Sequence, residues 1–391
     1  MTSTNTGMTD ADREAMQRAL ALASRVLTAT PNPRVGCVLI SDGELVGEGW
    51  HEQAGEPHAE ANALSQAGTR ARGATAYVTL EPCCVSGRTP PCTNALIDAG
   101  VAEVVYGMED PNPAVSGSGL QALRDAGVRV RGPVFEEQAR ALNPGFIKRM
   151  QYGLPWLRCK VAMSLDGRTA MASGESQWIT GPMARADVQL LRARSCAVLT
   201  GVNTVIADNP SLNVRAEQID RPDAARLARR QPLRAVMDSS LRTPPDSRII
   251  GLPGQVLFLV AGPHEHQLAR FADNAAMIRE AGGEAGGGRV APQQALRLLA
   301  DEFECNEVLL EAGPTLSGAM VQAGLVDEVV IYIGPRFLGS DAMPLLHLPG
   351  MQLMADQVAL RIREMDRLGD DCRIVAAVES IAGSPLVGAG E

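Results

Sequence analysis

Residues 74–83 read Ala-Thr-Ala-Tyr-Val-Thr-Leu-Glu-Pro-Cys, and this stretch decides how the first half of the chain folds. The run 74–80 is typical of a β-strand, so Cys83 is expected at the carboxyl end of that strand. Asp110 follows a second β-like run, 101–106, in the same way. Ligands of α/β sheets gather at the carboxyl ends of the strands. We therefore expect Cys83 and Asp110 to lie at one functional edge of a sheet.

Three potential metal ligands flank this stretch, namely His58, Cys83 and Cys92. One imidazole and two thiolates leave one of the four tetrahedral positions of zinc open for water, which is the arrangement of catalytic sites. The carboxylate of Glu60 remains spare, because residues two apart on a helix do not share a face and do not bind one metal together. In zinc deaminases a Glu of this kind, which is not a ligand, acts as general acid and base. Glu60 is therefore the candidate catalytic residue.

Two features leave the ligand set open. Residues 84–91 separate the two cysteines, whereas the usual deaminase signature closes with Cys-x-x-Cys, and Cys84 competes with Cys83 as the first thiolate. Taken singly, such a cysteine is more often a small core residue. Two other functions share these residues. One is a nucleic-acid base deaminase, and the other is a non-catalytic binding protein whose structural zinc takes Cys84 as a fourth ligand.

Length and charge limit the possible classes of protein. A chain of 391 residues predicts two or three domains at about 150 residues each. The hydrophobic share of 45% and the charged share of 21% are those of a soluble globular protein. A net charge of −9 argues against a broad nucleic-acid-binding face, which would have to be basic. We expect no nucleic-acid partner.

The first residues are polar and mildly acidic, which is typical of neither a secretory signal nor a transit peptide. No apolar stretch approaches the ~18 residues of a membrane span, so we expect no membrane partner. Eight cysteines in such a chain predict reduced thiols in the cytoplasm, some of which bind metal.

Residues 1–150 show an alternation of strands and helices. Helices are expected over 10–27, from His58 onward, and over 93–99, 119–126 and 135–149, and strands over 35–40, 44–50, 74–80, 101–106 and 128–134. Asp42-Gly43 predicts a hairpin between the first two strands. The alternation favours a sheet with parallel strands and crossover helices. Tyr152-Gly153-Leu154-Pro155 breaks the last helix, and we place a domain boundary there.

A second α/β alternation occupies residues 155–380. Strands are expected over 156–163, 196–200, 233–237, 256–260, 307–311 and 329–333, and a helix over 182–194. Residues 220–230 and 281–288 are expected to be surface loops, because the first segment is rich in charge and the second in glycine. The predicted fold class is thus α/β, with two domains.

Two loops of the second half could bind a phosphate. Residues 311–319 read Glu-Ala-Gly-Pro-Thr-Leu-Ser-Gly-Ala between a strand-like and a helix-like run, where glycines and helical N–H groups favour anions. Gly313 and Gly318 lack the Lys-Ser/Thr that a P-loop needs, so a tight strand-to-helix connection is as good an interpretation. Residues 200–204 follow a strand in the same way, and a ligand could span both loops.

Runs in both halves resemble one family. The runs are Pro31-Asn32-Pro33, Gly55-Glu56-Pro57-His58-Ala59-Glu60, Glu81-Pro82-Cys83, Gly87-Arg88-Thr89-Pro90-Pro91-Cys92, Asp110-Pro111-Asn112-Pro113, Ser164-Leu165-Asp166-Gly167-Arg168-Thr169-Ala170, Gly174-Glu175-Ser176-Gln177-Trp178-Ile179-Thr180 and Glu311-Ala312-Gly313-Pro314-Thr315. Over about residues 10–380 they closely resemble the bifunctional deaminase/reductases of riboflavin biosynthesis. The family also has the long insert between the two cysteines.

The resemblance implies a cytidine-deaminase-like N-terminal domain and a dihydrofolate-reductase-like C-terminal domain. The first would use zinc to remove the 2-amino group of 2,5-diamino-6-(5-phosphoribosylamino)pyrimidin-4(3H)-one. The second would use NADPH to reduce the ribosyl group of the resulting uracil to ribityl. The partner is then a small phosphorylated pyrimidine, and we expect a homo-oligomer.

The resemblance also implies roles for individual residues. Asn32, His51, Arg88 and Asp110 would line the deaminase pocket, with Arg88 at the substrate phosphate. NADPH would be held by Ala162, Trp178, Thr204, Asp208, Ser239 and the loop Gly313, Pro314, Thr315, Leu316, Ser317, Gly318 and Ala319. The reductase substrate would be held by Ser176, Arg192, Leu212, Arg215 and Glu311. Guanidinium groups suit that substrate because they pair bidentately with phosphate. The family usually has Ser-His-x where this chain has Cys84-Val85-Ser86, so one imidazole contact is missing.

Overall fold

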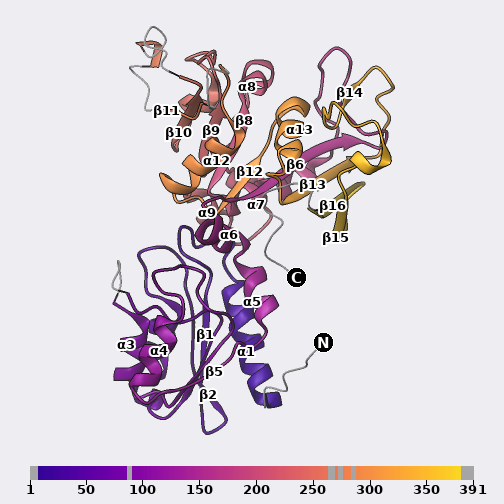
Figure 1. Ribbon diagram of the computed structural model, residues 1–391. Helices are drawn as coiled ribbons and strands as arrows, with labels where there is room; N and C mark the ends of the chain where they lie inside the picture. Colours follow the sequence, from indigo (N-terminus) through magenta and orange to yellow (C-terminus); the bar gives the residue numbers. More distant parts are fainter. Residues whose placement is uncertain (1–7, 86–89, 263–268, 272–275, 283–287, 380–391) are drawn as a thin grey trace. The chain divides into compact units, whose positions relative to one another are not determined.

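The chain forms two compact units, Met1–Leu154 and Pro155–Glu391. The structure is a computed structural model, and it describes residues 8–85, 90–262, 269–271, 276–282 and 288–379 (Figure 1). All eight cysteines lie in these ranges and are free thiols. Across the same ranges, every helix is too short or too polar to cross a lipid bilayer.

The first unit is a mixed β-sheet with helices on both faces, which gives three layers. Its strands are β1 (Gly36–Ser41), β2 (Glu44–Trp50), β3 (Thr75–Val78), β4 (Glu103–Tyr106) and β5 (Arg129–Arg131). Its helices are α1 (Asp10–Ala23), α2 (Ala59–Ala67), α3 (Cys92–Asp98), α4 (Ser118–Asp125), α5 (Glu136–Leu142) and α6 (Pro144–Tyr152). In the described residues the strand order is β2-β1-β3-β4-β5, and β1 is antiparallel to both of its neighbours.

Two apolar clusters show which helices cover which face of this sheet. Side chains of α2, α3 and α4 pack with Leu39, Val78 and Val104 on one face. Side chains of α1 pack with Val38 and Val105 on the other, as the positions of α1 and α3 on opposite sides of the strands in Figure 1 also show. Strands β3, β4 and β5 are parallel, as predicted. Their carboxyl ends therefore meet at one edge, and both Cys83 and Asp110 follow there.

Glycines on β2 set the position of α2. A Cβ atom on Gly47 would lie 2.3 Å from the carbonyl oxygen of Ala63, and one on Gly49 would lie 2.4 Å from that of Ala59. Only glycine lets the helix backbone approach so closely. The hairpin between β1 and β2 turns at Asp42 and Gly43, both with positive φ, which confirms the predicted turn.

Helix boundaries of the first unit differ from the predictions in two places. Helix α1 begins after its N-cap Thr9, whose side chain accepts a hydrogen bond from the N–H of Asp12, and it ends at Ala23 rather than at residue 27. The predicted helix 135–149 is two helices, α5 and α6. Asn143 has a non-helical backbone between them, because a proline at position 144 disfavours the helical conformation of the residue before it.

The second unit is built on a larger sheet. Its strands are β6 (Trp156–Ser164), β7 (Arg168–Ala170), β8 (Ala197–Gly201), β9 (Leu233–Met237), β10 (Val256–Val260), β11 (Ala276–Glu280), β12 (Glu307–Leu310), β13 (Glu328–Gly334), β14 (Met343–Pro344), β15 (Leu360–Leu368) and β16 (Asp371–Val378). Its helices are α7 (Pro182–Arg194), α8 (Val202–Asp208), α9 (Ala224–Arg229), α10 (Arg248–Gly251), α12 (Pro292–Asp301) and α13 (Pro314–Gln322).

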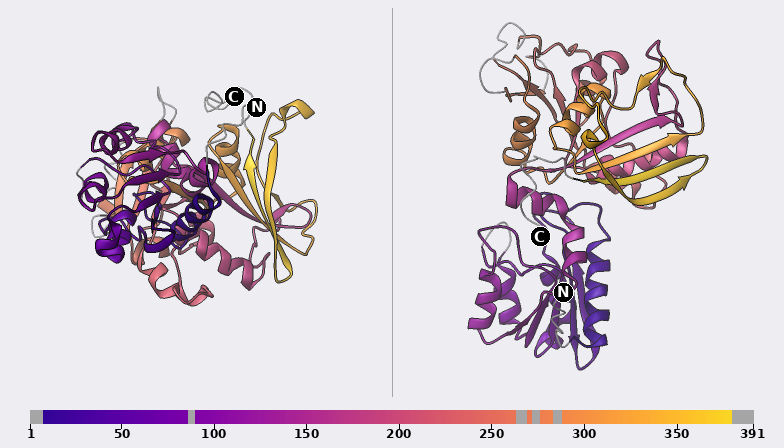
Figure 2. Two further views of the ribbon diagram at one scale, coloured as in Figure 1. Left: turned by 90° about the horizontal axis from the view of Figure 1, so that it is seen from below. Right: turned by 45° about the vertical axis from the view of Figure 1, so that its right-hand side comes forward.

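Nine of these strands, counted over the described residues, form a sheet in the order β11-β10-β9-β8-β12-β6-β13-β16-β15. All pairs from β11 to β13 are parallel, and the two pairs that involve β16 are antiparallel. Every residue of β10 and β12 is buried, as expected for parallel strands covered on both faces. The hairpin of β15 and β16, in yellow, forms one outer edge of the sheet (Figure 2). The α/β fold class is confirmed.

The two segments predicted as loops contain more order than their composition indicated. Residues 220–230 include helix α9, which spans six residues, so the loop prediction is wrong there. Of the glycine-rich segment 281–288, Gly282 makes an isolated bridge with Val290, and residues 283–287 lie outside the described part of the chain. The strands β7, β11, β14, β15 and β16 were not predicted.

Candidate active sites

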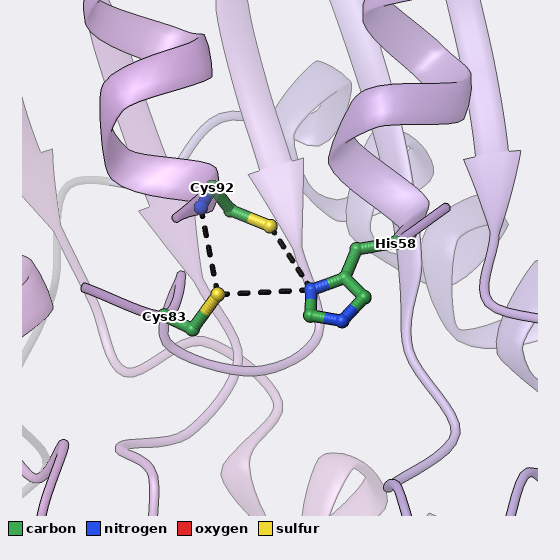
Figure 3. Close-up of side chains that lie close together, drawn as sticks. All are labelled: His58, Cys83 and Cys92. Atoms are coloured by element: carbon green, nitrogen blue, oxygen red, sulfur yellow. Dashed lines mark hydrogen bonds between the residues drawn. The ribbon is translucent and has the colours of Figure 1, made fainter. Parts of the chain in front are cut away.

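His58, Cys83 and Cys92 converge on one point of the first unit (Figure 3). Nδ1 of His58 lies 3.2 Å from Sγ of Cys92 and 3.6 Å from Sγ of Cys83, and the three potential ligand atoms all lie within 4.8 Å of one another. Tetrahedral zinc with bonds of about 2.0 Å to nitrogen and 2.3 Å to sulfur separates such ligand atoms by about 3.5 Å. The three side chains thus fit a zinc ion at their centre.

Each ligand sits at the end of an element. His58 is the residue before α2, Cys92 is the first residue of α3, and Cys83 lies in the segment that follows β3. Hydrogen bonds from Cys92 and His58 lower the pKa of the Cys83 thiol, and the same contact with Cys83 raises the pKa of Cys92. The surroundings of Cys83 therefore favour the thiolate form. Among the described residues, the group of potential ligands includes Cys83 and does not include Cys84.

Glu60 lies in the first turn of α2 and is 4% exposed. Burial raises the pKa of this carboxyl to about 7, and negative charge on Cys83 adds to the effect. A carboxyl with such a pKa can both hold and release a proton near neutral pH, as a general acid and base must.

Asn32 and His51 extend the site beside His58. Nδ2 of Asn32 lies 3.0 Å from Nε2 of His51, and Nδ1 of His51 lies 3.1 Å from the carbonyl oxygen of Pro57. The amide of Asn32 can only donate there and the carbonyl can only accept, so Nδ1 carries the proton and Nε2 accepts. Burial lowers the pKa of His51, which agrees with this neutral form. Its ring meets that of His58 edge to face, with centroids 5.1 Å apart.

Asp110 lies beyond β4 and is 7% exposed. Burial raises the pKa of its carboxyl to about 6. One of its oxygens accepts a hydrogen bond of 2.8 Å from the N–H of Asn112. Arg88, the residue expected at the substrate phosphate, lies outside the described residues.

In the second unit, Arg192 and Glu311 form a bidentate ion pair. Nε and a terminal nitrogen of Arg192, on α7, donate to the two carboxylate oxygens of Glu311 at 2.6 and 2.9 Å. Burial alone would raise the pKa of Glu311, but the charges of Arg192 and Lys160 lower it. Arg192 also donates to the carbonyl oxygen of Asn213 at 3.1 Å, which ties the pair to the segment that carries Leu212 and Arg215.

Leu212 and Arg215, in that segment, have an uncommon backbone conformation and a buried guanidinium nitrogen, respectively. Leu212 is buried with φ of +50°, a left-handed conformation that is uncommon for such a residue and clusters at functional sites. Nε of Arg215 is buried and has no hydrogen-bond partner in the described part of the chain. Burial lowers the pKa of Arg215, and the nearby charge of Arg192 lowers it further. These cations suit an anionic ligand.

Lys160 is a charged neighbour that sequence reasoning missed. It lies on β6, and burial lowers its pKa although the charge of Glu311 opposes this shift. Ala162, two residues on, lies on the same face of that strand and is paired with Tyr332 of β13. The available signal was a pair of cations, Arg158 and Lys160, in a strand that is otherwise mostly apolar.

The two candidate phosphate loops lie side by side. Gly313 precedes α13, and a Cβ atom on it would lie 3.9 Å from Oγ1 of Thr204 on α8. Gly318 is different, because a Cβ atom there would lie 2.0 Å from the carbonyl oxygen of His347. The absent side chain of Gly318 thus makes room for protein backbone. The hydroxyl of Ser317 is also engaged, since it donates to the carbonyl oxygen of Ala312 at 3.3 Å.

The remaining predicted residues lie in segments that follow the strands β7, β8, β9 and β12. Ser176 and Trp178 lie between β7 and α7, and the indole of Trp178 is 60% exposed beneath the guanidinium of Arg185 at 4.5 Å. Asp208 is exposed at the end of α8. Ser239 follows β9, and its hydroxyl accepts from the N–H of Val290 at 3.0 Å. Pro314, Thr315, Leu316 and Ala319 lie in α13.

Comparison with known proteins decides the family. The model of the RibD C-terminal domain matches residues 155–374, and that of the cytidine and deoxycytidylate deaminase zinc-binding region matches residues 9–108. The riboflavin biosynthesis protein RibD of Escherichia coli is 49% identical over 364 residues, which cover 92% of this chain and 97% of the relative. That of Haemophilus influenzae is 46% identical over 367 residues, which cover 92% and 95%. The chain belongs to the RibD family.

Solved structures of similar fold cover nearly the whole chain. RibD of Acinetobacter baumannii, form 1, is 44% identical with a TM-score of 0.86, covering 95% of this chain and 99% of that one. The Thermotoga maritima diaminohydroxyphosphoribosylaminopyrimidine deaminase/5-amino-6-(5-phosphoribosylamino)uracil reductase is 28% identical with a TM-score of 0.79, covering 94% and 98%. As a RibD, the chain is a bifunctional deaminase and reductase of riboflavin biosynthesis, and its cofactors are Zn²⁺ and NADPH. Its N-terminal half has the cytidine-deaminase fold and its C-terminal half a dihydrofolate-reductase-like fold.

Proposed function

We propose that residues 1–150 deaminate 2,5-diamino-6-(5-phosphoribosylamino)pyrimidin-4(3H)-one and that residues 155–380 reduce the product to 5-amino-6-(5-phosphoribitylamino)uracil. The observation that carries the proposal is the convergence of His58, Cys83 and Cys92 beside the buried carboxyl of Glu60. It supplies three zinc ligands and a separate proton carrier, which hydrolytic removal of an amine requires.

In the deaminase half, the three ligands would hold zinc, which supplies a water activated at neutral pH. Glu60 would take a proton from that water and give it to the leaving amine, since the pKa of its carboxyl lies near 7. Asn32, His51 and Asp110 would hold the pyrimidine, with the amide of Asn32 fixed by its contact with Nε2 of His51. Arg88 would meet the phosphate.

In the reductase half, NADPH would supply the hydride. Gly313, Pro314, Thr315, Leu316, Ser317, Gly318 and Ala319 would hold it together with Ala162, Trp178, Thr204, Asp208 and Ser239. Ser176, Arg192, Leu212, Arg215 and Glu311 would hold the sugar phosphate and the uracil. Within the described residues Nε of Arg215 is buried without a hydrogen-bond partner, and this supports an anionic ligand, because such a donor is otherwise costly.

We further propose a cytoplasmic homo-oligomer that binds neither nucleic acid nor membrane. The net charge of −9 supports the absence of a nucleic-acid partner. Strand β15 supports self-association, because it is an edge strand on which Leu360, Ile362 and Met365 are 44, 55 and 61% exposed. Light scattering of the purified chain measures the oligomeric state.

One assay tests the proposed reactions. The purified chain is given the diaminopyrimidine phosphate with NADPH, and ammonia and NADPH are followed in the same tube. We expect ammonia release to begin first and NADPH oxidation to follow after a lag, because the reductase acts on the deaminated product. Without NADPH, ammonia release should continue alone. NADPH oxidation that proceeds without ammonia release would contradict the proposed order.

A further inference from the structure

Glu81, in the motif Glu81-Pro82-Cys83, is a buried acid to which none of the proposed reaction steps assigns a task. It is 2% exposed, and its carboxylate accepts four hydrogen bonds from backbone N–H groups. Buried carboxylates are found where such partners satisfy them. All four partners belong to residues 110–120, and the arrangement of the two oxygens divides them into two pairs.

Oxygen Oε2 of Glu81 joins the two ends of the segment that carries Asp110. It accepts from the N–H of Asp110 at 3.1 Å and from the N–H of Gly117 at 3.0 Å. The N–H of Glu81 itself donates to the carbonyl oxygen of Met108 at 2.9 Å. Glu81 thus holds the backbone just before Asp110, at Asp110 and at the end of the segment 110–117.

Oxygen Oε1 caps helix α4. It accepts from the N–H of Gly119 at 2.9 Å and of Leu120 at 3.3 Å, in the first turn of the helix. The N-cap residue, Gly117, has no side chain for this task. A carboxylate at a helix N-terminus is further stabilised by the helix dipole.

The first turn of α4 also rests directly on the residue next to Cys83. A Cβ atom on Gly119 would lie 2.1 Å from the carbonyl oxygen of Pro82, so the two backbones are in contact. Cys83 in turn accepts from the N–H groups of Cys92 and Thr93, at 3.4 Å to its sulfur and 3.2 Å to its carbonyl oxygen. The candidate metal ligands and the Asp110 segment are therefore joined through Glu81 and Pro82.

We propose that Glu81 is the positioning residue that sets the place of the Asp110 carboxyl relative to the metal centre, and thereby the fit of the pyrimidine. The inference rests on the proposed role of Asp110 in holding the substrate. Glu81 touches no substrate. It acts through the backbone of Asp110. Loss of its four hydrogen bonds should weaken substrate binding while the metal and Glu60 stay in place.

Glu81→Gln tests this role, because the amide has the shape of the carboxylate but offers only one oxygen to the two pairs of N–H groups. We expect KM for the diaminopyrimidine phosphate to rise about tenfold or more with kcat nearly unchanged, the pattern of lost ground-state binding. Zinc per chain and reduction of added deaminated intermediate should stay at wild-type levels. Glu109→Gln is the matched control. It removes the same charge at the residue next to Asp110, but Glu109 is exposed.

Amide hydrogen exchange gives a readout that does not depend on activity. In Glu81→Gln the amides of residues 110–120 should exchange faster than in wild type, and in Glu109→Gln they should not. A wild-type KM in Glu81→Gln overturns the inference. So does a loss of activity that zinc loss accounts for entirely, because Glu81 would then serve only the metal site or the fold.

A parallel variant separates this inference from the function on which it rests. Asp110→Asn should raise KM at least as much as Glu81→Gln. If Asp110→Asn raises KM and Glu81→Gln does not, the positioning role is wrong and the substrate role of Asp110 stands. If neither variant changes KM, the proposed substrate role of Asp110 is wrong as well.

Discussion

At the scale of single residues, the neighbouring thiols of Cys83 and Cys84 differ in their surroundings. Sγ of Cys83 lies 3.6 Å from Nδ1 of His58 and accepts from the N–H of Cys92, whereas burial raises the pKa of the Cys84 thiol. Metal binding requires a thiolate, so an easily ionised thiol that faces the other ligands is favoured. Cys83 is therefore the proposed ligand.

Substitution of each cysteine in turn tests which of the two binds zinc. Cys83→Ser should remove most of the zinc from the purified chain, because a hydroxyl is a much poorer ligand for zinc than a thiolate. Cys84→Ser should keep about one zinc per chain. Metal analysis by mass spectrometry measures both, with reductase activity as the control for an intact chain. Equal zinc content in the two variants would show that the ligand assignment is wrong.

Residue types with metal-ligand chemistry could be found from sequence, because few other tasks explain His58, Cys83 and Cys92 in that order. The task of Glu81 could not be found in the same way. Its partners are backbone N–H groups, which every residue except proline has, so they leave no signal in the side chains. The left-handed backbone of Leu212 could not be predicted either, because a leucine side chain gives no sign of that conformation.

At the scale of elements, α1 is fastened to the sheet through Asp12, which is 4% exposed. Its carboxylate accepts from both terminal nitrogens of Arg131 at 2.8 and 2.9 Å and from the hydroxyl of Tyr77 at 2.7 Å. It also completes the capping box with Thr9. The hydrogen bonds from Arg131 hold the pKa of Asp12 well below its usual range, although burial opposes the shift.

Asp12→Asn should lower the free energy of unfolding by about 2 to 3 kcal/mol at pH 7, because it removes charge-assisted hydrogen bonds. The folded-state pKa lies below the unfolded-state value of about 4, so ionised Asp12 stabilises the fold above that pH. This contribution is lost as the pH falls through 4 toward the folded-state pKa, and wild type and variant should then converge. Urea denaturation at several pH values measures the difference.

The matched control is Asp10→Asn in the same helix turn, where the side chain is fully exposed. It should leave the free energy of unfolding close to that of wild type, because ion pairs of exposed side chains contribute little. A difference between wild type and Asp12→Asn that does not depend on pH would contradict the account.

Elements were predictable where apolar residues alternate or recur, and less so elsewhere. The strands β8, β9, β10 and β12 are short apolar runs and were found close to their observed bounds. Strand β15 is exposed along nearly its whole length and is rich in charge, and its apolar residues keep the two-residue spacing of a strand only from Leu360 to Ile362, so its signal is weak. Its pairing with β16 depends on contacts between strands rather than on its own composition.

At the scale of the whole molecule, two compact units carry two kinds of chemistry. The proposed deaminase residues all lie before Leu154, and the proposed reductase residues all lie after Pro155. The family resemblance identified both activities from sequence, because motifs of both halves occur in order. The geometry of Lys160 beside the Arg192–Glu311 pair, by contrast, required the folded sheet to bring three distant segments together.

Reciprocal inactivation of the two units tests the central claim most directly. Glu60→Gln should lower ammonia release from the diaminopyrimidine phosphate by about 10² to 10⁴, the usual contribution of general acid–base catalysis. Its reduction of added deaminated intermediate with NADPH should equal that of wild type. Arg215→Gln should show the converse, with reduction lowered about 10- to 150-fold in kcat/KM by loss of a charge-assisted contact and with normal ammonia release. Two activities that fall together in either variant would contradict the account of separate sites.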